Sequence, residues 1–333
     1  MLSDTVKLLK DPDTASTNLA LEVFETGSFG EIIHGRVICQ DDGQWFRIQS
    51  RILDFLPTQL RDEERYRAFA ARHGLQVLDR RPVPGQLDGQ HRQIDFFRKD
   101  SAVYDKDVSN LPFYRMFDRM YMDSWISRLP SKQSVLDLGG GTGRQALPLA
   151  RLGHTVCSCD ISEEMLGIAV GKAAEEGLVG KIDFLLCNAE DLPLISNCFD
   201  SIICYGSLHH FASPGSATLH AGRVLRAGGR WFSIDPHDSP LRFVFDLAMK
   251  SNKLYDEVAA DDRHFTGSQL RQLCADAGIA AEITYSTYVL PHMVHWLPDR
   301  LGYALLYLTD RVFQHLPLIN RLGGIVLAEG VKC

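Results

Sequence analysis

Residues 134–143 read SVLDLGGGTG, and this stretch decides the fold. An apolar run ends near Asp137 and passes into a turn with glycines at 139, 141 and 143, after which a helical pattern begins. Glycine lets a backbone turn approach a ligand closely because it has no Cβ atom. Ligands of open α/β sheets bind at the carboxyl ends of the strands. The stretch therefore predicts a ligand-binding turn between a strand and a helix.

The chain beyond this turn alternates between strand and helix patterns. Further apolar runs, at 155–160, 182–187, 200–206 and 230–235, are separated by helical patterns that end near glycines. Such alternation predicts a parallel sheet covered by helices on both faces. With two more strands at 281–289 and 324–332, the expected fold class is α/β, a doubly wound and mostly parallel sheet of seven strands.

The polar residues at the strand ends indicate the kind of ligand. A dinucleotide fingerprint needs G-x-G-x-x-G, and Arg144 stands in place of its third glycine. Asp160 ends the second strand, where an acid binds a ribose, although an acid there also favours a helix start. Asn188 and Ala189 follow the third strand and suit an adenine edge, with an ordinary polar loop as the alternative. Together these features favour a nucleoside over a dinucleotide.

Five motifs occur in order between residues 137 and 235: DLGGGTG, CDISEEML, NAEDLPL, FDSIICYGSLHHF and VLRAGGRWFSID. Together they resemble the class I S-adenosylmethionine-dependent methyltransferases, especially the branch with ubiquinone- and menaquinone-biosynthesis enzymes and many natural-product methyltransferases. The resemblance covers about residues 101–285. It implies a Rossmann-like methyltransferase fold with S-adenosyl-L-methionine as the cofactor.

The resemblance also implies roles for individual residues. Asp137 and the turn glycines lie near the methionine half of the cofactor, Asp160 binds the ribose, and Ile161 and Met165 pack on the adenine. Tyr104, in SAVYD, is similar to a residue of a segment that covers the cofactor. The full set of predicted cofactor-binding residues is Tyr104, Asp137, Gly139, Gly141, Gly143, Asp160, Ile161, Met165, Asn188, Ala189, Glu190 and Tyr205.

Methyl transfer from a sulfonium is an in-line displacement, in which the protein supplies alignment and a dry pocket. A base helps when the nucleophile is a hydroxyl or an acidic carbon, whereas an amine needs none. His209 and His210 follow the fourth strand and are the predicted catalytic residues. The alternative is that one of them only shapes the wall. Asp235 and His237 are the reserve candidates.

Residues 1–78 are interpreted as a small β-rich N-terminal module, with a hairpin turn at 41–43. The module resembles the zinc-ribbon-like segment that precedes some of these enzymes. A ribbon zinc site needs two cysteine pairs, but only Cys39 is present and Asp42 stands at a partner position, so no metal is expected. Residues 79–100 are predicted to be a linker and 101–333 the methyltransferase domain, with helical insertions at 236–262 and 288–322.

Composition limits the partners. The formal net charge is −7 and neither half of the chain is basic, which argues against a nucleic-acid substrate. No secretory signal and no membrane-spanning run is found, and eight scattered cysteines suit a reducing compartment, so a cytoplasmic protein is expected. Apolar stretches at 241–249 and 291–320 favour a small, hydrophobic acceptor and also suit a homodimer contact. The alternatives are an RNA or protein methyltransferase, or a cofactor-binding module without catalysis.

Overall fold

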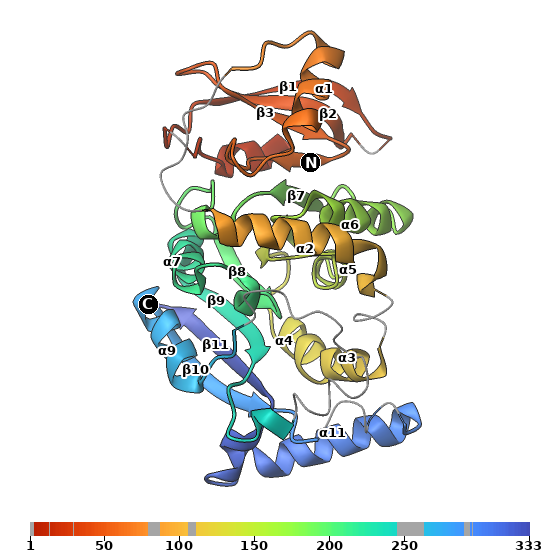
Figure 1. Ribbon diagram of the computed structural model, residues 1–333, viewed down its shortest axis with the longest axis vertical. Coiled ribbons are helices and arrows are strands. Elements are labelled where there is room, and N and C mark those ends of the chain that lie inside the picture. The colour runs from red at the N-terminus through yellow and green to blue at the C-terminus, as the bar shows by residue number, and fades with distance from the viewer. Residues whose placement is uncertain are drawn as a thin grey trace.

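The computed structural model describes residues 3–12, 14–28, 30–78, 87–105, 111–244, 263–289, 294 and 296–333. In this part of the chain, one sheet of eleven strands extends through the molecule (Figure 1). In sheet order the strands are β1 (Leu19–Thr26), β2 (Ile32–Cys39), β3 (Trp45–Gln49), β4 (Ile52–Asp54), β7 (Ile182–Leu186), β6 (Thr155–Asp160), β5 (Ser134–Leu138), β8 (Phe199–Tyr205), β9 (Leu225–Pro236), β11 (Ile325–Lys332) and β10 (Ile279–Ser286).

The described helices lie mainly between the strands in sequence. They are η1 (Ser3–Leu8), α1 (Glu63–His73), α2 (Asp88–Tyr104), α3 (Pro112–Phe117), η3 (Asp118–Met122), α4 (Asp123–Ser127), α5 (Ala146–Arg151), α6 (Glu163–Glu175), η4 (Ala189–Asp191), η5 (Leu208–His210), α7 (Pro214–Val224), α9 (Gly267–Asp276), α11 (Asp299–Phe313) and η6 (Ile319–Leu322). No helix in the described ranges is long and apolar enough to cross a membrane.

The predicted doubly wound sheet is confirmed. β5 pairs in parallel with both β6 and β8, which makes it the point where the strand order reverses. β11 lies antiparallel between β9 and β10. The side chains of β5 and β7 are almost all buried, as expected for strands covered on both faces. The carboxyl ends of β5 and β6 therefore meet where the sequence predicts the ligand.

The prediction of seven strands is wrong for the sheet as a whole, because β1–β4 continue it. β4 pairs in parallel with β7, with Ile52 opposite Phe184. Without β4, the edge of β7 would expose unpaired backbone groups. The buried Arg47 of β3 strengthens this junction, since its guanidinium binds Asp54 at 2.9 Å and Glu163 of α6 at 2.6 Å. The boundary of an N-terminal module at residue 78 stays a prediction.

The hairpin predicted at residues 41–43 is confirmed. β2 and β3 are antiparallel, with Ile38 opposite Trp45, and Gly43 has a φ of 76°. Ligand atoms of Asp11, Cys39 and Asp42 lie within 4.8 Å of one another at this hairpin. Burial raises the pKa of Cys39, which keeps its thiol protonated and makes it a weaker metal ligand. The expected absence of a metal here stays a prediction.

The predicted linker is wrong over residues 88–100, which form most of helix α2, while residues 79–86 lie outside the described ranges. Gln90, Gln93 and Ile94 are buried on one face of α2. Figure 1 shows α2 lying alongside α6. Burial of this face stabilises a helix after a segment rich in proline and glycine, and it brings α2 to the ligand-binding edge of the sheet.

Residues 112–127 form a helical segment that consists of α3, η3 and α4 in succession. Its apolar stripe is core packing, since Met116, Phe117, Trp125 and Ile126 are all buried. η3 is a single π-helical turn, and such turns are frequent at functional sites. Of the predicted insertions, 288–322 contains α11, whereas residues 245–262 lie outside the described ranges.

Candidate active site

The glycine turn after β5 has the backbone that only glycine adopts easily. Gly139 and Gly141 have φ values of 73° and 51°. The N–H groups of Gly139 and Gly140 both donate to the carbonyl of Cys159 at 2.9 Å, which holds the turn against β6. A Cβ on Gly139 would lie 2.6 Å from that of Ser207, whereas a Cβ on Gly141 would meet no atom within 4 Å. Gly141 therefore borders open space, as a ligand-binding turn should.

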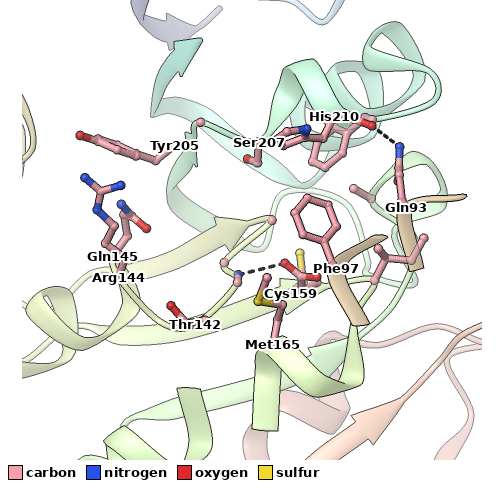
Figure 2. Close-up of a pocket in the computed structure, with 18 of the residues that line it drawn as sticks. Gln93, Phe97, Thr142, Arg144, Gln145, Cys159, Met165, Tyr205, Ser207 and His210 are labelled. Carbon is pink, nitrogen blue, oxygen red and sulfur yellow. Dashed lines mark hydrogen bonds between the residues drawn. The ribbon is translucent and has the colours of Figure 1, made fainter. Parts of the chain in front are cut away.

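A pocket opens beside this turn, at the carboxyl ends of β5, β6, β7 and β8 (Figure 2). The predicted cofactor-binding residues that line it are Tyr104, Gly139, Gly141, Asp160, Ile161, Met165, Asn188, Ala189 and Tyr205. They come from five separate segments of the chain, so the fold brings together residues that are up to about a hundred positions apart in sequence. Their individual roles in binding stay predictions.

Asp137, Gly143 and Glu190 do not line the pocket, although they were predicted to bind the cofactor. Asp137 is 1% exposed and accepts a hydrogen bond from Ser158. Burial, and then the nearby Asp160, raise the pKa of Asp137 to about 7. Glu190 accepts from Gln90 of α2 at 2.8 Å. The contacts of Asp137 and Glu190 hold neighbouring segments together, and the predicted roles of all three residues in cofactor binding stay predictions.

Asp160, the predicted ribose-binding acid, lines the pocket at the end of β6. Its Oδ2 accepts from the N–H of Gly141 and its Oδ1 from the N–H of Ser162, both at 2.9 Å. Burial raises the pKa of Asp160, while these backbone N–H groups act in the opposite direction. The cap of α6 is Ser162, whose hydroxyl accepts from the N–H of Met165. The Asp160 carboxylate therefore lines the pocket instead of capping the helix.

Helix α2 contributes two lining residues that were not predicted. Gln93 donates to the carbonyl of His210, and the rings of Phe97 and His210 meet edge to face with centroids 5.2 Å apart (Figure 2). Gln93 and Phe97 were missed because this segment was predicted to be a linker. The signal was nevertheless present, because Gln90, Gln93, Ile94, Phe97 and Ser101 recur at helical spacing.

A second group, of which only Tyr205 was predicted, lies on the opposite side of the pocket from Gln93 and His210 (Figure 2). The Arg144 guanidinium binds both carboxylate oxygens of Asp118 at 2.8 Å, and the Tyr205 hydroxyl donates to the same carboxylate. Burial, and then Asp118, raise the pKa of Tyr205 well above its usual value. Gln145 is 4% exposed, and its Nε2 has no hydrogen-bond partner among the described residues.

The two predicted catalytic histidines occupy different positions. His210 lines the pocket, whereas His209 is buried and does not line it. His209 Nδ1 lies 2.9 Å from Asp235 Oδ1. Burial lowers the pKa of His209 and raises that of Asp235. His237, the other reserve candidate, contacts the carbonyl of Gly323 at 2.7 Å. A base from this segment would therefore be His210, and His209 could act only through its neighbours.

The fold and the pocket define a class of protein. A glycine turn follows β5 and the acid Asp160 ends β6. The antiparallel strand β11 lies between β9 and β10. This is the architecture of Rossmann-like enzymes that bind a nucleoside-containing cofactor at the topological switch point.

Comparison with known proteins identifies the family. The model of the methyltransferase domain family matches residues 136–233. A ubiquinone/menaquinone biosynthesis C-methyltransferase from Shewanella pealeana is 30% identical over 203 residues, which cover 55% of this chain and 80% of the relative. A protein of the same description from Cronobacter sakazakii is 29% identical and is matched over 88% of its length. The chain therefore belongs to the class I S-adenosylmethionine-dependent methyltransferases, and S-adenosylmethionine is its cofactor.

Solved structures agree on the fold. The [4+2]-cyclase SpnF has a TM-score of 0.53 and 20% identity, and covers 75% of this chain and 98% of its own. Phosphoethanolamine N-methyltransferase 2 from Haemonchus contortus, in complex with S-adenosyl-L-methionine, has a TM-score of 0.51 and 16% identity, and the match covers 76% of this chain and 62% of that one. At these identities the likeness concerns the fold alone.

Proposed function

We propose that this enzyme transfers the methyl group of S-adenosylmethionine to a carbon atom of a small, largely apolar acceptor. The observation that carries the proposal is the pocket, which combines the cofactor-binding turn with the aromatic rings of Phe97, Tyr104, Tyr205 and Phe211. The curated relatives, described as C-methyltransferases of ubiquinone and menaquinone biosynthesis, support a carbon acceptor on an apolar ring. The acidic net charge of −7 favours such a molecule over RNA.

The described residues fit the cofactor at both ends. Asp160 has lone pairs left for the ribose hydroxyls after accepting from two backbone N–H groups. On the far side of the pocket, the buried Nε2 of Gln145 needs an acceptor, and a carboxylate of the methionine moiety would supply it. Gly141 leaves space between these ends. The cofactor supplies a methyl group on a positively charged sulfur, which is why alignment matters more than acid–base chemistry.

The side of the pocket formed by Arg144, Asp118 and Tyr205 suits an electron-rich acceptor. The Tyr205 hydroxyl is committed to Asp118, so the ring of Tyr205 and the guanidinium of Arg144 are what the pocket presents. The guanidinium is paired with Asp118 but has N–H donors left over, and such a donor would stabilise an ionised hydroxyl on the acceptor ring, which increases the electron density at ring carbons. The new carbon–carbon bond forms as the carbon–sulfur bond breaks. The proton then leaves the same ring carbon to water or to His210.

The test is transfer of a labelled methyl group. The purified full chain is incubated with S-adenosylmethionine labelled on the methyl carbon and, separately, with a hydroxylated apolar ring, the same ring with its hydroxyl blocked, an alkyl amine and bulk transfer RNA. We expect label on a ring carbon of the first acceptor only, located by nuclear magnetic resonance of the product. The Asp160→Ala variant, assayed at a cofactor concentration below the wild-type Kd, is the control and should transfer less label. Transfer to RNA or to the amine alone would overturn the proposed acceptor.

A further inference from the structure

More than half of the exposed large hydrophobic residues in the described part of the chain fall in one segment outside the pocket. Fifteen large hydrophobic residues are exposed in the described part of the chain, and eight of them fall between residues 296 and 319. This segment contains α11, which forms the end of the molecule opposite β1–β3 (Figure 1). None of its residues lines the cofactor pocket. A cluster of this kind marks an interaction surface, whereas single exposed apolar residues are ordinary.

The exposed apolar residues of α11 form one stripe along the helix. Leu301, Leu308 and Val312 are 58%, 59% and 53% exposed, and the partly exposed Leu305 falls between them. The spacing of four, three and four residues places all four side chains on one face. Gly302 and Leu306, on another face of the helix, are buried and hold α11 against the rest of the protein. The stripe therefore points away from the core.

Arginines flank this stripe. Arg300 and Arg311 are exposed and eleven residues apart, so they lie on one side of the helix, about 90° around the axis from the leucines. Arg321 follows in the same segment. Of the two acids between residues 296 and 322, Asp310 is buried and only Asp299 is exposed. The segment is thus positive at its surface in a chain whose formal net charge is −7.

We propose that α11 docks this enzyme on an anionic lipid surface, lying in the plane of the membrane interface. An amphipathic helix with leucines on one face and arginines beside them binds in this way, because the leucines enter the acyl boundary while the guanidinium groups reach the phosphates. Trp296, 75% exposed just before α11, and Leu318, 81% exposed after it, extend the apolar surface at both ends. A second copy of the chain suits this surface less well. It would place the same arginines against these arginines, and Asp299, the only exposed acid of the segment, would be their only opposite charge.

Vesicle flotation tests the proposal on the full chain. We expect binding to vesicles of equal parts phosphatidylglycerol and phosphatidylcholine, and much weaker binding to phosphatidylcholine alone. The double variant Leu301→Gln/Leu308→Gln should reduce the partition coefficient at least tenfold. Arg300→Gln and Arg311→Gln should each reduce it about fivefold on the anionic vesicles only. Leu152→Gln is the matched control, since Leu152 is 61% exposed at the end of α5 and should bind as the wild type does.

Other outcomes would overturn the proposal. It fails if the wild type does not float with anionic vesicles, or if the double variant binds as well as the wild type. It also fails if sedimentation shows a wild-type dimer that the double variant converts to monomers, because a second copy would then cover the stripe. All variants should bind S-adenosylhomocysteine with wild-type affinity, since α11 does not line the pocket. Docking is therefore tested separately from the acceptor of methyl transfer.

Discussion

Replacing Asp160 by alanine is the most direct test of the cofactor site. Each carboxylate oxygen accepts one backbone N–H, from Gly141 or Ser162, and keeps a lone pair directed to the pocket. The variant loses the charged acceptor of the ribose hydroxyls, and a hydrogen bond to a charged group contributes about 1.5–3 kcal/mol. Water in the vacated space recovers part of this. We therefore expect binding to weaken by about 1–3 kcal/mol, or about 5- to 150-fold in Kd.

The assay is calorimetric titration of cofactor-free protein with S-adenosylhomocysteine, which requires no turnover. Asp191→Ala is the matched control, because Asp191 carries the same charge but is exposed on η4 and does not line the pocket. Its affinity should be that of the wild type. Equal affinity of Asp160→Ala and the wild type would refute the ribose assignment. Folded protein that gave no heat with this nucleoside but a clear signal with NAD would refute the whole site.

Four further substitutions, one of them also combined with a second change, test stability and binding. Gly140→Ala places a Cβ 2.1 Å from Ser158 Oγ, so thermal unfolding should show a loss of stability. The new Cβ of Gly141→Ala meets no atom within 4 Å, so this variant should lose only about 1 kcal/mol of stability. Its affinity for the cofactor should nevertheless fall at least tenfold. The pKa of Asp137 is raised to about 7 in the folded state, whereas the unfolded chain releases this proton above about pH 4. The free energy of unfolding of the wild type therefore falls as the pH rises towards 7. Asp137→Asn should therefore gain about 2–3 kcal/mol relative to the wild type between pH 5 and 8 in urea unfolding without cofactor, and a constant difference would contradict the assignment. Arg144→Met leaves Asp118 without its guanidinium and should cost about 2–3 kcal/mol, part of which Arg144→Met/Asp118→Leu recovers if the cost is an uncompensated charge.

The parts of the fold that the sequence predicts well are those with local signals. The turn at 139–143 needs glycine, and Gly139, Gly141 and Gly143 have the positive φ values that such a turn requires. The hairpin at Gly43 depends on a single tight turn. In each case a few neighbouring residues determine the backbone, so no knowledge of distant contacts is required.

The parts that were missed depend on distant contacts. The pairing of β4 with β7 joins Ile52 to Phe184, and no local pattern in either strand specifies that partner. The helical face of α2 was hidden by the proline and glycine residues before it, and it is stabilised by burial against the rest of the protein. His209 and His210 are neighbours in sequence, yet only His210 lines the pocket. Sequence spacing places a residue at a strand end but does not determine which side chain faces the ligand.

The N-terminal strands have a structural connection to the cofactor site that a separate module would not need. Arg47 of β3 is 1% exposed and binds Glu163, the first residue of α6. Glu163 follows Ser162, whose N–H donates to Asp160. The added strands thus hold the first turn of α6, and that turn holds the acid at the ribose position. Removing one partner of this ion pair would leave an uncompensated charge, so the pair stabilises the contact between β3 and the start of α6.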